Sequence, residues 1–320
     1  MKAKSNPNIL VYYHKEKYVD WYKELLERAR KDLTILACKE KNQIEKNIEK
    51  ADILFSGHRF PMELLPRAKN LKWIQSMSAG VENFIRSKLI PSNVILTKPK
   101  GIFGSLMAEY VIGYILAILK NMKKTFENQA NKLWEPLEVD GLQHKTVGIM
   151  GLGSVGAHIA YRLHLLGLEV IGLDEQERNL PYLAKEYPVE GMDNFLGKSD
   201  FVVLTVPLTE STEGIIGEKQ FMSMKESAHL INISRGPLVQ EKALIKSLQK
   251  GMIAGAVLDV FNEEPLPKDH PLWNFKNVII TPHISGPSLP EDLAKIFLEN
   301  LKRWEEGKKL EGMVDIHKGY

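Results

Sequence analysis

The sequence predicts an α/β protein of two domains, each built on a largely parallel sheet. A chain of 320 residues is too long for one ordinary domain and long enough for two separate cores. Short apolar runs alternate with charged, helix-like stretches in two successive series, one within residues 8–97 and one starting at residue 145. Such alternation is typical of stacked βα units, in which helices join parallel strands.

Composition excludes several classes of protein. Apolar residues make up 44% of the chain and charged residues 26%, values typical of a globular protein. The 43 Lys and Arg and the 40 Asp and Glu give a net charge of +3, and because both signs are interspersed we expect no nucleic-acid partner. Cys38 is the only cysteine, which excludes an intramolecular disulfide and a Cys-x-x-Cys metal site. We expect a reducing, cytoplasmic location and no bound metal.

The two most membrane-like segments are both too short to span a bilayer. The N-terminal apolar run ends at Tyr13 with no small-residue cleavage site behind it, so we interpret it as a first strand rather than a signal peptide. The longest apolar stretch, residues 106–119, contains Glu109 and falls short of the ~20 residues that a spanning helix needs. We interpret it as a buried helix and expect no membrane association.

Branched apolar runs mark the expected strands. The first series predicts five: NILVYY, LTILAC, ADILF, LKWIQS and NVILT. The second predicts six: KTVGIM, LEVIGL, DFVVLTV, AHLINI, AGAVLDV and NVIITP. Between the series, residues 104–131 predict one long helix of the kind that joins domains or subunits, apolar in its first half and polar in its second. Residues 289–307 also have helical periodicity and are expected to fold back onto the first domain.

A glycine-rich turn at the start of the second series predicts a dinucleotide site. The run GLGSVG at residues 151–156 places Gly-x-Gly-x-x-Gly between a strand and a helix, the context in which that pattern binds dinucleotides. Gly151 is expected to make the tight turn, Gly153 to let the pyrophosphate approach the backbone, and Gly156 to let helix and strand pack closely. The phosphates are expected at the helix N-terminus, where unpaired N–H groups favour an anion.

An acidic residue at the end of the next strand bears on the choice of cofactor. Asp174 stands 23 residues after Gly151 and is expected to accept hydrogen bonds from the ribose hydroxyls. Its carboxylate would repel a 2′-phosphate, which favours NAD over NADP. Arg178 lies close by in the sequence. It either pairs with Asp174 or Glu175, the interpretation that we favour, or contacts a 2′-phosphate.

Polar residues follow four strands of the second series, at the sheet edge where ligands of open α/β folds bind. They are Pro207, Arg235, Asp259 with Glu264 beyond it, and His283 with Gly286 beyond it. Reduction of a 2-oxo acid needs a cation for the substrate, a proton donor for the forming alkoxide and a group that orients the donor. Arg235, His283 and Glu264 fit these roles, because histidine titrates near neutrality and a neighbouring carboxylate favours the imidazolium. Each of these three residues taken alone could have a purely structural role. The prediction therefore depends on all three lying at the same edge of the sheet.

These motifs resemble those of the D-isomer-specific 2-hydroxyacid dehydrogenases. The resemblance extends over nearly the whole chain through VGIMGLGSVG, INISRGPLV, GAVLDVFNEEPLP and ITPHISG. It implies a flavodoxin-like substrate domain (residues 1–100 plus 289–320), an inserted Rossmann NAD-binding domain (residues 101–288), and a homodimer formed through the NAD domains and the helix near Glu109. It also implies that Arg235, Glu264 and His283 are catalytic.

The resemblance further implies binding residues in both domains. Backbone N–H groups at Ser78, Ala79 and Gly80 are expected to hold the substrate carboxylate, together with Arg235 and His283. Asp259 is expected to contact the carboxamide of the nicotinamide. The expected cofactor-binding residues are Gly151, Gly153, Ser154, Val155, Gly156, Asp174, Thr205, Val206, Pro207, Thr212, Ile233, Ser234, Arg235, Asp259, His283 and Gly286.

Within the family, the ending MVDIHKGY and the helix start GIFGSLMAEY are most similar to the glyoxylate and hydroxypyruvate reductase branch. NADP-using members of that branch carry basic residues where this chain has Asp174, so its cofactor need not follow the branch. Two alternatives stay open: a phosphoglycerate dehydrogenase without a regulatory domain, and a non-enzymatic, NAD-sensing protein like the corepressors that share this fold. Trp134 is either a core residue or part of a partner subunit's substrate pocket. Lys98 either alters the substrate pocket or is solvated.

Overall fold

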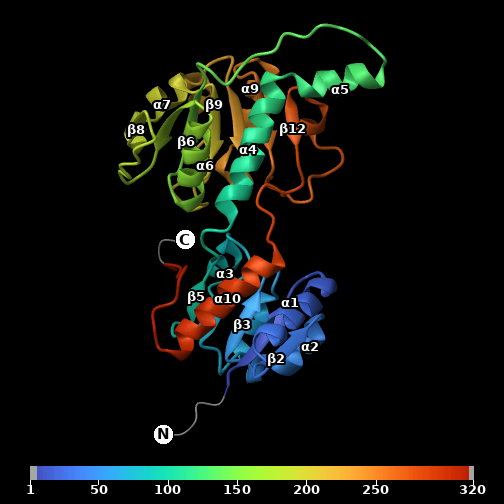
Figure 1. Cartoon of the computed structure of the whole chain (residues 1–320), viewed down its shortest axis with the longest axis vertical. Coiled ribbons are helices and arrows are strands. Elements are labelled where there is room, and N and C mark those ends of the chain that lie inside the picture. Colours follow the sequence, from blue (N-terminus) through green and yellow to red (C-terminus); the bar gives the residue numbers. More distant parts are fainter. Residues whose placement is uncertain (1–5, 317–320) are drawn as a thin grey trace. The chain divides into compact units, whose positions relative to one another are not determined.

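The computed structural model describes residues 6–316 and divides the chain into two compact units. Unit 1 comprises Met1–Ile102 and Ser288–Tyr320, and unit 2 comprises Phe103–Pro287 (Figure 1). Each unit has its own parallel sheet, one of 5 strands and one of 7. The expected α/β class with two parallel sheets is therefore confirmed. The last four residues of the MVDIHKGY ending lie outside the described residues.

In unit 1, every apolar run expected to form a strand does so. The strands pair in parallel in the order β2-β1-β3-β4-β5, which is the flavodoxin-like order. From β1 the sheet extends to β2 on one side and to β3 on the other, and ligands of this fold bind beside the carboxyl ends of β1 and β3. The strands are β1 (Asn8–Tyr12), β2 (Thr34–Cys38), β3 (Ile53–Ser56), β4 (Trp73–Ser76) and β5 (Ile95–Thr97).

Alternate strand residues of unit 1 contribute to two cores, one on each face of the sheet. Leu10 and Leu54 belong to the core that α2 and α3 cover, whereas Ile9 and Phe55 belong to the core that α1 and α10 cover. The helices are α1 (Glu16–Ala29), α2 (Lys41–Asn47), α3 (Glu82–Ser87) and α10 (Pro290–Glu305), with short 3₁₀ turns η1 (Ile48–Lys50) and η2 (Met62–Arg67).

The helix α10 completes the core of the N-terminal sheet. Its Phe297 is fully buried and stacks on Phe55 and Trp73, with ring centroids 4.5 and 5.2 Å apart. Burying such a ring contributes roughly 2–3 kcal/mol. The Arg30 guanidinium also donates to the Glu305 carboxylate, at 3.1 and 3.2 Å. Segments from the two ends of the sequence therefore share one core.

In unit 2, the sheet has the doubly wound order of a Rossmann fold. The parallel strands run β12-β11-β10-β9-β6-β7-β8, so the strand order reverses between β6 and β9, where dinucleotides bind in this fold. The six expected strands all form. The strands are β6 (Thr146–Met150), β7 (Glu169–Leu173), β8 (Lys185–Tyr187), β9 (Phe201–Leu204), β10 (His229–Asn232), β11 (Gly255–Leu258) and β12 (Val278–Ile280).

The sequence pattern missed β8. This strand has three residues, Lys-Glu-Tyr, and pairs only with β7 at the edge of the sheet. Its Lys185 is exposed, Glu186 is partly buried and only Tyr187 is buried, so the strand lacks the apolar run by which the other strands were recognised.

The prediction of a single long helix over residues 104–131 is wrong. Two helices, α4 (Phe103–Leu119) and α5 (Met122–Ala130), meet at an angle of 63°. Asn121 between them adopts a left-handed conformation (φ 52°), which ends the first helix because asparagine tolerates this region better than most residues. Among the described residues no single helix is long and apolar enough to cross a membrane, and only this bent pair meets the criteria of length and composition.

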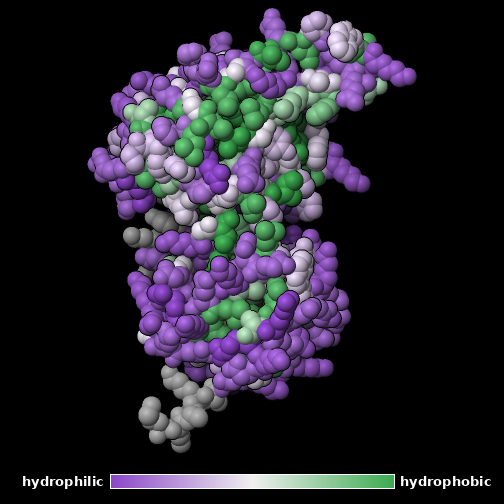
Figure 2. All heavy atoms as spheres, in the orientation of Figure 1, coloured by the Kyte–Doolittle hydropathy of each residue, from purple (hydrophilic) through white to green (hydrophobic). Residues whose placement is uncertain are grey.

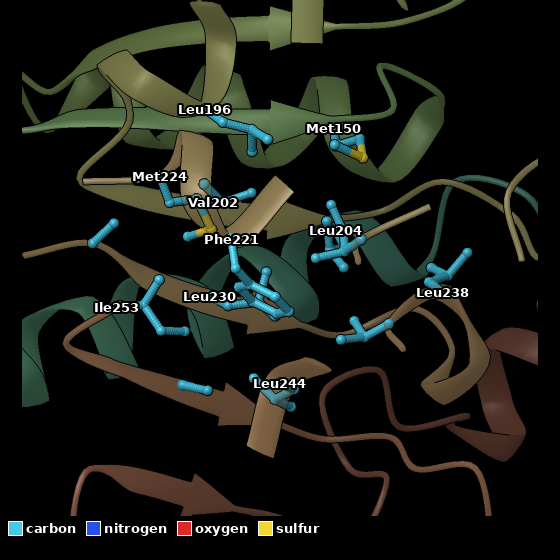
Figure 3. Packing of buried hydrophobic residues seen from close by; sticks show 14 of the residues in the cluster. Met150, Leu196, Val202, Leu204, Phe221, Met224, Leu230, Leu238, Leu244 and Ile253 are labelled. Atoms are coloured by element: carbon cyan, nitrogen blue, oxygen red, sulfur yellow. The ribbon is translucent and has the colours of Figure 1, made fainter. Parts of the chain in front are cut away.

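Two cores lie on opposite faces of the unit 2 sheet. Leu204 and Leu230 contribute to the core that Leu196 and Phe221 of the covering helices complete (Figure 3), whereas neighbouring strand residues such as Val203 pack with α4 and α6. The covering helices are α6 (Ser154–Leu165), α7 (Met192–Lys198), α8 (Glu218–Ser223) and α9 (Glu241–Gln249), with 3₁₀ turns η3 (Val189–Gly191), η4 (Gly236–Leu238) and η5 (Pro271–Asn274). The loops at the carboxyl ends of the strands carry the candidate site.

Candidate active site

The glycine loop joins β6 to α6, and each of its glycines has a distinct environment. Gly151 has φ +97°, and a Cβ there would lie 2.8 Å from the Val206 backbone nitrogen. A Cβ on Gly156 would lie 1.9 Å from the Gly151 carbonyl oxygen, so both positions require glycine. A Cβ on Gly153 would meet no protein atom within 4 Å. Open space therefore lies beside the N-terminus of α6. The first two residues of that helix are Ser154 and Val155.

The loop after β9 is fixed against the glycine loop by side-chain hydroxyls. The Thr205 hydroxyl bonds to the Gly151 carbonyl oxygen at 2.6 Å and to the Met150 carbonyl oxygen at 3.0 Å. The Ser234 hydroxyl, beyond β10, donates to the Val206 carbonyl oxygen at 2.6 Å. Within the loop, the Thr212 hydroxyl donates to the Pro207 carbonyl oxygen at 2.6 Å. These expected cofactor-binding residues thus lie together where the strand order reverses.

The Asp174 side chain, just beyond β7, accepts hydrogen bonds from the glycine loop and from its own loop. Its Oδ2 accepts the Leu152 backbone N–H at 2.7 Å, and its Oδ1 accepts the Gln176 N–H and an Arg178 guanidinium N–H, both at 3.0 Å. The Asp174 side chain is 11% exposed. The favoured interpretation of Arg178, an ion pair with Asp174, is confirmed.

Arg235 follows β10, close to the segment that follows β11. Its Nη1 donates to the Ser234 carbonyl oxygen at 2.6 Å, and the Asn232 side chain donates to the carbonyl oxygen of Arg235 at 2.8 Å. A Cβ on Gly236 would lie 2.1 Å from the carbonyl carbon of Phe261. Only glycine therefore lets the Arg235 segment approach the backbone that leads to Glu264. Ile233, which precedes these residues, is buried.

Glu264 and His283 form a hydrogen-bonded pair. His283 Nδ1 lies 2.8 Å from Glu264 Oε2, and Glu264 Oε1 accepts the Phe261 backbone N–H at 3.0 Å. Burial alone would raise the pKa of Glu264. The bonds from His283 and Phe261, with the charges of His283 and Arg235, outweigh burial and hold the pKa of Glu264 below its usual value. The carboxylate is thus ionised at neutral pH and accepts a proton-bearing Nδ1.

Asp259 organises the loop that carries His283. Its carboxylate is fully buried and accepts hydrogen bonds from the Thr281 hydroxyl at 2.6 Å and from the Ile284 and Ser285 backbone N–H groups at 2.8 Å. Its backbone carbonyl oxygen accepts the His283 N–H at 2.9 Å. This loop brings His283 into a left-handed conformation (φ 55°), which is held by the surrounding hydrogen bonds.

Tyr110 and Thr281 extend this network, and sequence reasoning missed both. The Tyr110 hydroxyl lies 2.5 Å from Thr281 Oγ1 across 171 residues of sequence. Because Thr281 gives its only proton to Asp259, Tyr110 is the donor to Thr281. Thr281 stands two residues before His283, which could have indicated it, whereas no signal in the sequence connects Tyr110 to the site. Gly286 also meets α4, since a Cβ there would lie 3.2 Å from Met107.

The expected substrate-binding segment of the first domain, residues 78–80, lies in unit 1 after β4. The Ser78 N–H donates to the Ser76 hydroxyl at 3.0 Å. Among the described residues, the N–H groups of Ala79 and Gly80 have no hydrogen-bond acceptor. This segment can therefore offer two backbone donors to an anion.

The remaining candidates have mixed outcomes. The core alternative for Trp134 is wrong, because its side chain is 100% exposed. Lys98 is half-buried, and its backbone N–H donates to the Gly312 carbonyl oxygen at 2.8 Å. Between residues 6 and 316, no group of three or more His, Cys, Asp or Glu side chains could hold a metal ion.

Comparison with known proteins assigns this arrangement to a family. Residues 112–285 match the model of the D-isomer specific 2-hydroxyacid dehydrogenase NAD-binding domain. Over 272 residues the chain is 33% identical to the glyoxylate reductase of Thermofilum pendens, an overlap that covers 82% of this chain and 80% of the relative. The chain belongs to the D-isomer specific 2-hydroxyacid dehydrogenase family. It is thus a dehydrogenase that acts on CH–OH donors with a nicotinamide cofactor, and the open space at Gly153 fits a pyrophosphate.

Solved structures of 2-hydroxyacid dehydrogenases share its fold. A family protein from Aeromonas salmonicida subsp. salmonicida A449 superposes with a TM-score of 0.91 at 34% identity, covering 98% of this chain and 100% of that one. The NADPH-dependent glyoxylate/hydroxypyruvate reductase of Sinorhizobium meliloti, solved with NADP and sulfate, has a TM-score of 0.90 at 28% identity and the same coverage. Because this relative binds NADP, membership of the family does not decide between NAD and NADP.

Proposed function

We propose that this dehydrogenase uses NADH to reduce small 2-oxo acids, such as glyoxylate or hydroxypyruvate, to D-2-hydroxy acids, and catalyses the reverse oxidation with NAD. The observation that carries the proposal is the Glu264–His283 pair, with 2.8 Å between Oε2 and Nδ1, on the unit that matches the NAD-binding model. The glyoxylate and hydroxypyruvate reductases among the relatives support this choice of substrates.

In this proposal His283 is the acid of the reduction. With Nδ1 bonded to Glu264, the other ring nitrogen donates a proton to the substrate carbonyl oxygen, and the carboxylate stabilises the imidazolium before transfer. A bound reduced nicotinamide supplies the hydride to C2 of the substrate. His283 becomes neutral as its proton passes to the oxygen, and solvent restores that proton. In the oxidation the neutral imidazole accepts the hydroxyl proton.

Fixed donors are proposed to hold the substrate carboxylate. Arg235 provides a permanent positive charge and planar donors that match a carboxylate and polarise the neighbouring carbonyl. Its position is set by Ser234 and by the close approach of Gly236 to Phe261. The N–H groups of Ala79 and Gly80 are the proposed donors from unit 1. In this arrangement Asp259 positions His283, and it would contact the carboxamide of a bound nicotinamide.

NAD rather than NADP is the proposed cofactor. A 2′-phosphate placed beside Asp174 would face its carboxylate, and Arg178 is already paired with that carboxylate at 3.0 Å. A ribose 2′-hydroxyl can instead donate to Asp174.

The exposed apolar surface of unit 2 supports a homodimer. Figure 2 shows hydrophobic side chains gathered over the face that α4 and α6 cover, where Tyr161, Leu165 and Leu166 are exposed. On and beyond α5, Phe126 is 65% and Trp134 100% exposed. Such surfaces usually mark interfaces, and we propose that a second copy covers them in a cytoplasmic enzyme. In sedimentation experiments we expect the wild type to be a dimer and the Phe126→Asp variant to be a monomer.

A panel of 2-oxo acids tests the proposed reaction. Glyoxylate, hydroxypyruvate, pyruvate and phosphohydroxypyruvate are each assayed with NADH and NADPH by nicotinamide absorbance. His283→Ala is expected to lower kcat at least a thousandfold while NADH binding changes less than twofold, and Arg235→Ala to raise KM and lower kcat. Rates like those of the wild type in His283→Ala would refute the mechanism. The absence of turnover with every acid would refute the function.

A further inference from the structure

The helix α4 contacts the loop that carries His283 at two points. Tyr110 reaches the start of this loop, where its hydroxyl oxygen lies 2.5 Å from Thr281 Oγ1. Met107 lies against the end of the loop, because a Cβ on Gly286 would lie 3.2 Å from its side chain. His283 stands between these two contacts in the sequence. The position of α4 can therefore influence the position of His283.

The hydroxyls of Tyr110 and Thr281 form a hydrogen-bonded chain that ends on Asp259. Thr281 donates its one proton to Asp259 Oδ1 at 2.6 Å, so its oxygen accepts the proton of Tyr110. Burial raises the pKa of Tyr110 above its ordinary value, which keeps this hydroxyl protonated at neutral pH. Because hydrogen bonds in series polarise one another, the Tyr110 donor strengthens the bond from Thr281 to Asp259.

Asp259 fixes the backbone at His283 and at the two residues that follow it. Its carbonyl oxygen accepts the His283 N–H at 2.9 Å, and its carboxylate accepts the Ile284 and Ser285 N–H groups at 2.8 Å. Thr281 is the one side chain among the described residues that donates to this buried carboxylate. These bonds hold His283 at φ 55°, a conformation that a residue with a side chain adopts only when its surroundings enforce it. A carboxylate that shifts or turns would therefore move His283.

Tyr114 provides a matched comparison for Tyr110. It stands one turn further along α4, and the two rings lie 4.5 Å apart between centroids. Both side chains are half-buried. Between residues 6 and 316 the Tyr114 hydroxyl has no hydrogen-bond partner, whereas that of Tyr110 has Thr281. Removing either hydroxyl makes the same chemical change on the same helix, and only the removal at Tyr110 breaks the chain to Asp259.

We propose that Tyr110 is a positioning residue for the reaction, whose hydroxyl holds the loop that carries His283. It acts through Thr281 and Asp259 and does not contact the substrate. The link to catalysis rests on the proposed function, in which His283 donates the proton, whereas the hydrogen-bonded chain does not. A displaced proton donor slows proton transfer but leaves the donors to the substrate carboxylate in place, so we expect the effect in kcat rather than in KM.

Steady-state kinetics separate this role from a general one in folding. With NADH and the 2-oxo acid that turns over best, Tyr110→Phe is expected to lower kcat at least tenfold while KM and NADH affinity change less than twofold. Tyr114→Phe is the matched control, and its kcat should stay within twofold of the wild-type value. Thermal unfolding shows whether each variant is folded.

Variants of Thr281 test whether Tyr110 acts through it. Thr281→Val removes the hydroxyl that links Tyr110 to Asp259, so adding Tyr110→Phe to Thr281→Val should lower kcat no further. Thr281→Ser keeps that hydroxyl. It should therefore retain most of the wild-type kcat, together with the sensitivity to Tyr110→Phe.

Amide hydrogen exchange, followed by NMR, tests the loop without any substrate. The Ile284 and Ser285 amides, which donate to Asp259, should exchange at least tenfold faster in Tyr110→Phe than in the wild type or in Tyr114→Phe. Amides within α4 should exchange at unchanged rates, because the hydrogen bonds of the helix do not involve the hydroxyl. If Tyr110 only tethered α4, the exchange of the α4 amides would rise instead.

Three results would overturn the inference. A wild-type kcat in Tyr110→Phe removes the role in the reaction, whatever the exchange rates. An equal fall in kcat from Tyr110→Phe with and without Thr281→Val shows that Tyr110 does not act through Thr281. Faster exchange throughout α4, with a lower melting temperature, shows that Tyr110 only tethers the helix. If no 2-oxo acid is reduced, the proposed function fails, and the exchange of the Ile284 and Ser285 amides still decides whether the Tyr110 hydroxyl holds the loop.

Discussion

The Asp174 carboxylate accepts the backbone N–H of Leu152, so the side chain proposed to bind the ribose also fixes the glycine loop. Asp174→Asn keeps an acceptor for Leu152 but removes the charge that repels a 2′-phosphate and pairs with Arg178. We expect the wild type to prefer NADH to NADPH at least tenfold in kcat/KM, and the variant to lose most of that preference.

Glu177→Gln is the matched control, since Glu177 is an exposed acid on the same loop. A wild type that prefers NADPH would show that Arg178, rather than Asp174, governs the ribose end.

Substitutions in the glycine loop are predicted to affect NADH binding and protein stability to different degrees. Gly153→Ala adds a methyl group where no protein atom lies within 4 Å, so stability should fall by no more than about 1 kcal/mol, the usual cost of alanine at an N-cap, while NADH affinity falls at least tenfold. Gly156→Ala places its methyl group 1.9 Å from the Gly151 carbonyl oxygen and should lower both affinity and the melting temperature. Fluorescence titration with NADH and thermal unfolding measure the two effects. Unchanged NADH affinity in Gly153→Ala would place the pyrophosphate elsewhere.

The Glu264–His283 pair predicts a loss of activity when the carboxylate is neutralised. Because the pKa of Glu264 lies below its usual value, the carboxylate stays charged throughout the neutral range and accepts the Nδ1 hydrogen of His283. Glu264→Gln removes that charge and the orientation it imposes on the ring, so the rate at pH 7 should fall ~100-fold. Glu263→Gln, one residue away and exposed, is the control. A rate at pH 7 in Glu264→Gln like that of the wild type would refute the role of the carboxylate.

His229 predicts a loss of stability in acid. Burial lowers the pKa of His229 to about 4 from the ordinary value of 6.5, so the unfolded state binds the proton first. This stabilisation is complete above pH 6.5 and is lost as the pH falls toward 4, by on the order of 2–3 kcal/mol. Urea unfolding of unit 2 at pH 7 and pH 4.5 should show a smaller loss in His229→Gln than in the wild type. Equal losses would contradict this assignment; His164→Gln, an exposed histidine of α6, is the control.

Much of the fold could be predicted because buried parallel strands are continuous apolar runs. The features that the sequence analysis did not predict lack such an apolar run. The strand β8 is short and charged because it lies at an edge. The break at Asn121 depends on one residue in a left-handed conformation, which the helical pattern on either side does not reveal.

The candidate site was predictable where single residues stand at strand ends, as Arg235, Glu264 and His283 do. It was not predictable where side chains distant in sequence meet. Tyr110 reaches Thr281 only after the chain has folded α4 against the sheet.

The stacking of Phe297 between Phe55 and Trp73 has a consequence for synthesis on the ribosome. The strands of unit 1 are made before unit 2, yet their apolar face stays uncovered until α10, which follows unit 2 in the sequence, has been synthesised. Unit 2 is continuous in sequence, so it can bury its apolar residues while that face of unit 1 is still exposed. The strands of unit 1, although made before unit 2, therefore belong to the unit that finishes folding later, and during that interval their exposed apolar face makes them the segment most in need of a chaperone.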